Sequence, residues 1–438
     1  MIQQVSWCRR RSEGRIAQGS RLLTVARVSQ YYTECSTKQG SPSAANSRDG
    51  PDMDLDLPVE AIELQKLCRD FAAKEIEPFA ETWSEEERFP SDVFLKMGEL
   101  DLTGLLISQE YGGTDVGYVS YVAAMEAIGA ADQSFAAAWN AHSTIASLPL
   151  AAFGTEEQKK KWLVPLASGK KIGAFGLTEP TAGSDAAGIR TTARQDADGW
   201  LINGAKMFIT NAGTEVSLGV TILAATGTNA DGSKRFGTFY IPTGTDGYTV
   251  GRPLRKLGWH GMDTRELIFD NCWIPADNLI GEEGNGLRQF LDVLDGGRIS
   301  VAALALSLAQ EALDLAAVHA TQREQFGRRL ADFQAVQHKL ADMATEVDAA
   351  RSLVYRAAWL ADNDRPFGKE AAMAKLYASE VANRAASASV QIHGGYGYVR
   401  ESKISRFYAD AKVLEIGEGT NEIQRNVIAR SVVRSVRT

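Results

Sequence analysis

Near the C-terminus a single glutamate, Glu418, lies between two glycines in the segment Ile416-Gly-Glu-Gly-Thr-Asn-Glu-Ile-Gln-Arg. Glycines on both sides let the backbone approach a bound molecule closely. A carboxylate in such a loop can act as a general base if burial raises its pKa toward neutral pH. A glutamate in a glycine-rich loop is more often a solvated turn residue, so the segment alone leaves both roles open.

A second segment, Phe175-Gly-Leu-Thr-Glu-Pro-Thr-Ala-Gly-Ser-Asp, combines small residues with hydroxyls. Thr178, Gly183 and Ser184 suit a loop whose backbone comes close to a planar ring or a pyrophosphate. Small side chains leave room there, and hydroxyls can donate or accept hydrogen bonds. A tight turn capped by threonine and serine would have the same composition.

A third segment, Lys206-Met-Phe-Ile-Thr-Asn-Ala-Gly, has the alternation of a β-strand. This alternation places Phe208 and Thr210 on one face of the strand, so an aromatic ring and a hydroxyl would stand two residues apart. Packing of Phe208 in a hydrophobic core is the alternative role, and both roles predict a strand here.

Charged residues mark two positions in the C-terminal third. Asp295 and Arg298 flank a pair of glycines at what we expect to be the start of a helix, where an acidic cap is the ordinary role. Arg323 follows a long helix that we expect to begin near Ser300. Its planar guanidinium suits bidentate contact with a phosphate, although a charged helix end next to one buried aromatic, Phe326, would look the same.

The spacing of apolar residues predicts the elements that position these segments. Helical spacing extends from Leu57 to about Gly169, short alternating runs fill about 172–280, and helices return after Gly286. One helix carries the apolar seam of a bundle: Phe333, Val336, Leu340, Met343, Val347, Ala350 and Val354.

We therefore predict an α+β fold with an N-terminal helical domain (53–171), a small middle β-barrel or sheet domain (172–285) and a C-terminal helical bundle (286–438). Residues 1–52 are rich in arginine and poor in acidic residues. We predict that they are a disordered leader, either an over-extended translation start or a transit peptide.

Composition excludes several classes of function. A formal net charge of −8 and a pI near 5.4 argue against a nucleic-acid surface, which needs a basic face. Four cysteines form no CxxC pair and five histidines form no HExxH motif, so we expect neither a disulfide framework nor a metal site. The apolar stretch from Val301 is interrupted by Gln310, Glu311 and Asp314, and we predict no membrane span.

The three segments, with Arg323-Glu-Gln-Phe-Gly and Gln391-Ile-His-Gly-Gly between them, together resemble the signature set of the acyl-CoA dehydrogenases in order and spacing. The resemblance extends from about Leu57 to the C-terminus, and the short-chain and branched-chain members look most similar. It implies an FAD-dependent enzyme that oxidises an acyl-CoA thioester across its α,β bond, with Glu418 as the base. Some members of the family place their base at the position held here by Gly297.

The resemblance also implies the ligand contacts. Thr178 would bond the pyrimidine edge of the flavin, Phe208 stands where the family usually has tryptophan, and Arg323 would reach the FAD pyrophosphate of a neighbouring subunit in a homotetramer. The residues expected at FAD are Phe175, Leu177, Thr178, Gly183, Ser184, Phe208, Thr210, Arg323, Gln325, Phe326, Gln391, Gly395, Thr420 and Glu422. Those expected at the substrate are Ser184, Asp295, Arg298 and Gly419.

The implied partners are an acyl-CoA substrate and an electron-transfer flavoprotein that takes the electrons. The alternatives are an acyl-CoA oxidase or an enoyl-CoA reductase on the same scaffold, or a catalytically silent acyl-CoA-binding protein. Gly417, where many straight-chain members carry tyrosine, favours short or branched acyl chains, because it leaves room beside the reacting carbons. We expect a cytoplasmic bacterial enzyme, or a mitochondrial matrix enzyme if residues 1–52 are a transit peptide.

Overall fold

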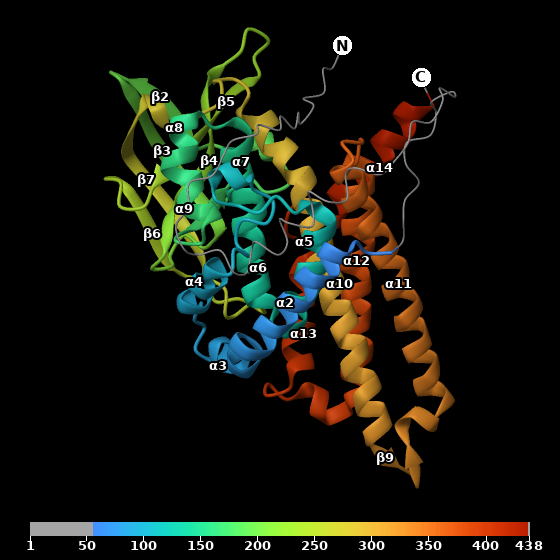
Figure 1. Ribbon diagram of the computed structural model, residues 1–438. Coiled ribbons are helices and arrows are strands. Elements are labelled where there is room, and N and C mark those ends of the chain that lie inside the picture. The colour runs from blue at the N-terminus through green and yellow to red at the C-terminus, as the bar shows by residue number, and fades with distance from the viewer. Residues whose placement is uncertain (1–55, 437–438) are drawn as a thin grey trace, which may run out of the picture.

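The computed structural model describes residues 56–436, so the predicted leader, residues 1–52, lies outside the described residues. The chain runs from a group of helices through a β-sheet into a bundle of long helices (Figure 1). The predicted α+β order is therefore confirmed.

The N-terminal helices are mostly short, because prolines and polar caps divide them. Asp132 accepts a hydrogen bond from the backbone N–H of Phe135 at 2.7 Å, and Thr155 forms a capping box with Gln158. The helices are α2 (Val59–Glu75), α3 (Ala80–Glu85), α4 (Ser91–Glu99), α5 (Gly117–Ala131), α6 (Gln133–Ala141), α7 (Leu148–Phe153), α8 (Glu156–Gln158) and α9 (Val164–Ala167).

The middle part is one twisted sheet whose strands are ordered β6-β7-β3-β2-β4-β5-β8, with β1 pairing in parallel with β4. Its strands are β1 (Ile172–Gly176), β2 (Thr192–Asp196), β3 (Gly199–Thr210), β4 (Ser217–Thr228), β5 (Lys234–Pro242), β6 (Tyr248–Pro253), β7 (Thr264–Pro275) and β8 (Leu279–Ile280). The sheet ends at β6 and β8, which do not pair, so it is open. The barrel version of the prediction is therefore wrong. In the middle of the sheet, β2 meets β4 through one residue pair, Thr192 and Ala225.

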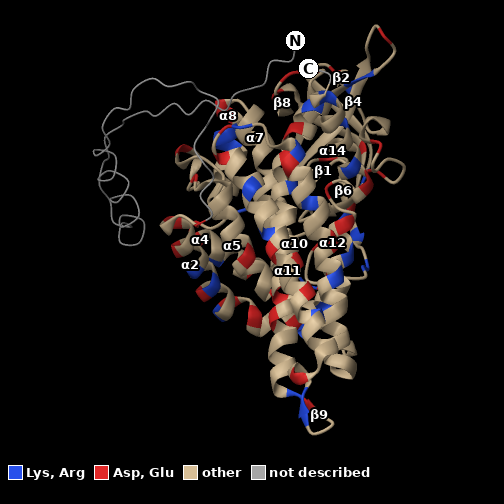
Figure 2. Ribbon diagram, turned by 90° about the vertical axis from the view of Figure 1, so that its right-hand side faces the viewer, with Lys and Arg blue, Asp and Glu red and all other residues tan. Residues whose placement is uncertain are grey.

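The C-terminal part consists of α10 (Gly286–Gln322), α11 (Gln334–Asp362), α12 (Gly368–His393), α13 (Lys403–Ala411) and α14 (Asn421–Ser435), with a small hairpin, β9 (Glu324–Gln325) and β10 (Arg328–Arg329), at the tip of the bundle. The predicted seam of α11 is confirmed: Met343, Val347, Ala350 and Val354 are buried. Figure 2 shows acidic and basic residues interspersed along these helices, with a basic stretch of the chain at the tip beside β9.

Helix α10 is the central helix of the molecule. It is long and apolar enough to cross a membrane by length and composition, yet its middle section, from Ile299 to Ala309, is buried against α5 and α12. It begins at Gly286 and not near Ser300, so Asp295 and Arg298 lie inside the helix, and their predicted place at its start is wrong. The two glycines between them, which suggested a helix start, lie within the helix, where neighbouring side chains leave no room for a β carbon: one on Gly296 would stand 2.2 Å from the hydroxyl of Tyr118.

Candidate active site

Glu418 lies in the loop that precedes α14, and its backbone points the carboxylate inward. Glu418 and Gly419 both have left-handed conformations, with φ values of 50° and 90°. Such a conformation is uncommon for a residue with a side chain and needs support from its surroundings. The support comes partly from Gln424, whose amide donates to the carbonyl of Gly419 at 2.8 Å, and from Thr420, which caps α14 through the N–H of Ile423.

The two oxygens of the Glu418 carboxylate differ in their hydrogen bonds. Oε1 accepts a hydrogen bond from Nδ2 of Asn140, on α6, at 3.4 Å. Oε2 is buried and has no hydrogen-bond partner in the part of the chain that the structure describes. Because a buried polar atom without a partner is costly, this oxygen is positioned to receive a proton or a ligand.

Helix α10 forms the wall on which the carboxylate lies. A β carbon on Gly297 would stand 2.2 Å from Oε2 of Glu418, so the absence of a side chain there makes room for the acid. Arg298 is ion-paired with Asp295, and its buried Nε has no hydrogen-bond partner within residues 56–436. Gly297 and Arg298 therefore lie beside Glu418, and Asp295 is attached to this group through Arg298.

The electrostatic environment makes Glu418 a weak acid. Burial raises its pKa to about 8, against the opposing influence of the positive charges of Lys375 and Arg298 and the hydrogen bond from Asn140. A carboxylate with a pKa near neutral is matched to proton transfer, because it is basic enough to accept a proton and still ionises at physiological pH.

The segment that contains Thr178 is attached to β3 and to the residues that precede β2. The carbonyl of Thr178 accepts from the N–H of Met207 at 2.8 Å. Next to it, Glu179 forms a buried ion pair with Lys206 at 2.8 Å and accepts from the N–H groups of Arg190 and Thr191. The glutamate of this motif therefore has a structural role that fixes the loop.

The predicted alternation of β3 fails at Phe208. A bulge between Lys206 and Ile209 gives Phe208 a φ of 62°, and its side chain is 66% exposed, so core packing of this ring is excluded. The phenyl ring stands free beside the Thr178 loop, two residues before Thr210. Gly183 and Ser184, in the same loop, are exposed, and a β carbon on Gly183 would meet nothing within 4 Å.

Phe175 and Leu177 are placed differently from the rest of this group. The ring of Phe175 stacks on that of Phe290, on α10, with centroids 4.3 Å apart, and Leu177 packs against the same small apolar cluster. Their half-buried side chains join the sheet to the bundle.

A separate cluster forms at the tip of the bundle. The guanidinium of Arg323 lies over the ring of Tyr396, 5.7 Å from its centroid, next to Gly395. Phe326 is 94% exposed and touches the edge of Phe333. Arg323, Gln325, Phe326 and Gly395 are thus brought together, with exposed aromatic and cationic groups that a flat anionic partner would fit.

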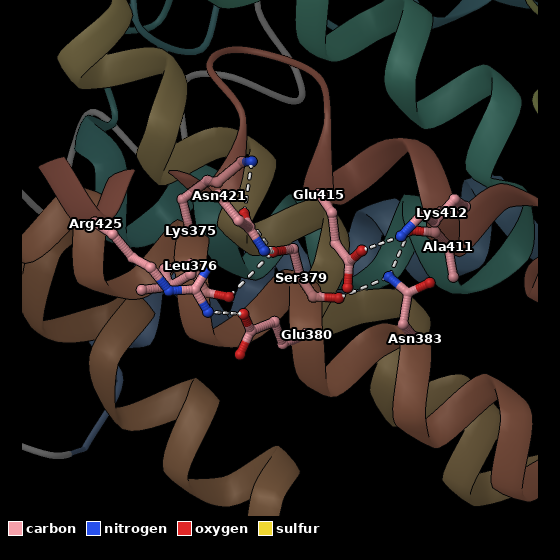
Figure 3. Close-up of polar contacts among 10 residues, drawn as sticks. All are labelled: Lys375, Leu376, Ser379, Glu380, Asn383, Ala411, Lys412, Glu415, Asn421 and Arg425. Atoms are coloured by element: carbon pink, nitrogen blue, oxygen red, sulfur yellow. Dashed lines mark hydrogen bonds and ion pairs between the residues drawn. The ribbon is translucent and has the colours of Figure 1, made fainter. Parts of the chain in front are cut away.

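Two adjoining hollows connect the remaining predicted residues. Thr420 and Glu422 line a cavity of about 180 Å³, and Gln391 lines a groove of about 580 Å³ along α12. Glu380 and Glu415, both labelled in Figure 3, line both hollows, so the two adjoin.

Sequence reasoning missed the side chains that set the state of Glu418. Asn140 and Lys375 lie outside every motif, and neither residue type is unusual in a helix. Lys206 and Glu179 lie inside motifs, but their pairing needs the fold. A fully buried lysine is a usable signal once the structure is known, because lysine is almost never buried without a partner.

Models of three domains match almost all of the described chain: acyl-CoA dehydrogenase, N-terminal domain, at residues 59–170; middle domain, at residues 174–272; and C-terminal domain, at residues 284–433. The chain belongs to the acyl-CoA dehydrogenase family. A probable acyl-CoA dehydrogenase of Bacillus subtilis is 48% identical over 87% of this chain and all of that protein. The mitochondrial short-chain specific acyl-CoA dehydrogenase of Bos taurus is 44% identical over 88% of this chain and 92% of that protein.

Among solved structures, butyryl-CoA dehydrogenase from Megasphaera elsdenii superposes with a TM-score of 0.84 at 39% identity, covering 87% of this chain and 100% of the other. The protein is therefore an acyl-CoA dehydrogenase, an oxidoreductase that acts on acyl-CoA thioesters. The residues predicted to hold FAD fit a large planar cofactor: open space beside Gly183 and Gly395, and exposed rings at Phe208 and Phe326.

Proposed function

We propose that this enzyme converts a short or branched acyl-CoA to the 2-enoyl-CoA, and that Glu418 removes the proton from the carbon next to the thioester carbonyl. The observation that carries the proposal is the buried oxygen Oε2 of Glu418, which lies against Gly297 without a hydrogen-bond partner among the described residues. FAD, when bound, supplies the acceptor for the hydride that leaves the β carbon.

The protein's own groups divide the remaining work. Asn140 holds Oε1, which leaves Oε2 to take the proton. Glu418 and Gly419 form a left-handed turn. We propose that the N–H of Glu418 in this turn donates to the thioester oxygen, where negative charge develops. Asp295 and Arg298 are proposed substrate contacts beside the base, and Ser184, in the Thr178 loop, is proposed to face the CoA portion.

For the cofactor, we propose that Thr178, Phe208 and Thr210 contact the flavin ring, and that Thr420 and Glu422 hold the remainder of the same FAD. The tip cluster is proposed to reach the pyrophosphate of a neighbour's FAD in a homotetramer, for which its exposed Arg323 and Phe326 are the support. The other proposed FAD contacts are Phe175, Leu177, Gly183, Gln325, Gln391 and Gly395.

Two observations support a short or branched acyl chain: the names of the relatives, short-chain specific and butyryl-CoA dehydrogenase, and Gly417 next to the base. We propose that an electron-transfer flavoprotein takes the electrons, as the family resemblance implies. A cytoplasmic bacterial enzyme remains our expectation, with the Bacillus relative as its support.

The test is Glu418→Gln, which removes the proton acceptor and keeps the shape of the side chain. We expect normal flavin content and substrate binding, but a loss of kcat of at least 10²-fold, the ordinary worth of a general base. Flavin bleaching by butyryl-CoA without oxygen measures the step directly. The matched control is Glu311→Gln, on α10, because burial also raises the pKa of Glu311 but the residue pairs with Lys403. If Glu418→Gln kept more than about a tenth of wild-type kcat, the assignment of the base would be wrong.

A further inference from the structure

Two lysines have side chains with no exposed surface, and they differ in their partners. Lys206 forms an ion pair with the carboxylate of Glu179 at 2.8 Å. Lys375, in the first half of α12, takes part in none of the ion pairs found within residues 56–436, although it is equally buried. Burying an ammonium without a carboxylate partner is costly, so the position of Lys375 needs a compensating interaction.

The ammonium of Lys375 is hydrogen-bonded to two neutral oxygens. It donates to the carbonyl of Gly419 at 2.9 Å and to Oδ1 of Asn421 at 3.0 Å. Figure 3 shows Lys375 on α12 directed at Asn421, whose amide in turn donates to Ser379, one turn along the same helix, at 3.1 Å. The lysine thus joins α12 to the loop that contains the base.

The carbonyl that Lys375 holds belongs to the residue directly after Glu418. Gly419 also accepts from Gln424, so two side chains fix this one oxygen. The two left-handed residues, Glu418 and Gly419, therefore owe part of their conformation to Lys375. A change at Lys375 would alter the direction in which the carboxylate of Glu418 points.

Charges around the pair come from four elements. Arg298 on α10, with its partner Asp295, faces both Glu418 and Lys375. Glu415 before the loop and Glu422 on α14 also act on Lys375. Tyr118 and Tyr121 on α5 lie near Glu418: burial raises the pKa of both hydroxyls, and the charge of Glu418 raises it further. Glu415 is paired with Lys412, which leaves Glu418 as the acid that acts most strongly on Lys375.

We propose that Lys375 is a positioning residue for the base: it holds the Glu418 loop through the carbonyl of Gly419 and supplies a positive charge that favours the ionised carboxylate. Burial lowers the pKa of Lys375 to about 8 and raises that of Glu418 to about 8. Against these effects of burial, each of the two charges favours the ionised form of the other group. This inference rests on the proposed function, in which Glu418 is the base.

The test uses the flavin-loaded enzyme and the pH dependence of kcat/KM with butyryl-CoA. Lys375→Met removes the charge and the donors while nearly keeping the volume. We expect the pH at which kcat/KM reaches half its maximum to rise by about 1 unit or more, since an opposite charge nearby shifts a carboxyl pKa by ~1–3 units. We expect Lys375→Arg, which keeps the charge, to return this midpoint toward wild type. Lys403→Met, on α13, is the control for loss of a largely buried lysine and should leave the midpoint unchanged.

If Lys375→Met does not fold with flavin, Lys375→Gln replaces it, since glutamine keeps a donor but not the charge. A midpoint that coincides with wild type in the folded variant overturns the proposal, and so does a shift of equal size in Lys403→Met. The two levels of inference are distinguishable. An active Glu418→Gln enzyme refutes the base itself, whereas an inactive one combined with an unshifted Lys375 variant refutes only the role of the lysine.

Discussion

Gly297 lies directly against the carboxylate of Glu418: a β carbon at residue 297 would stand 2.2 Å from Oε2 and 3.3 Å from the carboxyl carbon. A side chain at position 297, on α10, and the side chain at position 418, in the loop before α14, would therefore occupy the same space. Resemblance to the family implies that other members place their base at the first of these positions. The present geometry explains why one chain can carry a side chain at only one of the two.

We predict that Gly297→Ala displaces the base. The added methyl group would overlap Oε2, and a shift of about 1 Å at a reacting group can lower kcat by about 10²-fold. Flavin content and the unfolding midpoint should change little, because Gly297 is helical and alanine favours a helix. Gly261→Ala, outside the candidate site, is the control, since its β carbon would meet nothing closer than the β carbon of Ser134, at 3.4 Å. Equal activities of the two variants would contradict the overlap.

We predict that kcat/KM rises with pH and levels off above about 8, because Glu418 must be ionised to accept a proton and burial raises its pKa to about 8. Well below that pH, the rise should be about tenfold per unit for a single ionisation. A profile that is flat between pH 6 and 9 would show that the carboxyl is already ionised at pH 6.

The same pKa predicts an effect on stability. A folded-state pKa above the value of 4.5 for an exposed glutamate favours folding fully below pH 4.5, and this contribution is lost as pH rises through about 8. Glu418→Gln, which does not titrate, should therefore gain in thermal stability relative to wild type between pH 5 and pH 9. Thermal unfolding of both proteins at the two pH values measures the difference, and a constant difference would contradict the raised pKa.

We predict that Arg323→Ala loses FAD and weakens the oligomer together, because the tip cluster is proposed to serve a neighbour's cofactor. Arg328→Ala is the control: it removes an arginine from the same tip, but the guanidinium of Arg328 lies 3.8 Å from the centroid of Phe333 in its own chain and is not proposed to contact FAD. Flavin absorbance and gel filtration are the measurements. Unchanged flavin content and size in Arg323→Ala would remove the basis for the cross-subunit contact.

We predict that Gly417→Tyr narrows the acyl site. The comparison is kcat/KM for butyryl-, isobutyryl-, 2-methylbutyryl- and octanoyl-CoA in both enzymes. The tyrosine should penalise the branched substrates more than butyryl-CoA, by roughly 10–200-fold, since a methyl group in an apolar pocket is worth ~1–3 kcal/mol. The prediction fails if octanoyl-CoA is the best of the four for wild type, or if the tyrosine penalises all four equally.

The sequence predicted what depends on repeated local pattern. The seam of α11 and the three-part order follow from hydrophobic spacing, which each element must satisfy along its own length. Sheet closure was not predictable, because it depends on which strands pair at the edges. The start of α10 was misplaced because the pair Gly296-Gly297 has the composition of a helix break. The structure shows another reason for the two glycines: the hydroxyl of Tyr118 and the carboxylate of Glu418 occupy the space that side chains would need.

The candidate site shows the same division. Motifs located Glu418, but its partners come from helices far away in the sequence: Asn140 is 278 residues distant, and Lys375 reaches the loop across 44 residues. Phe208 is a second example. The alternation of residues predicted its strand, but the bulge that exposes the ring depends on the pairing of β3 with β7. Such contacts leave no periodic trace in one sequence.

Helix α10 carries Gly297 and Arg298 next to Glu418 and continues without interruption to Gln322, directly before Arg323 at the tip of the bundle. Because each residue of an α-helix turns the chain by about 100°, inserting one residue between Arg298 and Arg323 would rotate the tip by that angle relative to the part of the helix next to Glu418. The number of residues between Arg298 and Arg323 therefore fixes the direction in which Arg323 points relative to Arg298. The turn between β4 and β5 is not constrained in this way, because Gly232 in that turn has open space around it. Length variation in relatives of this enzyme should therefore concentrate in the sheet loops and avoid this helix.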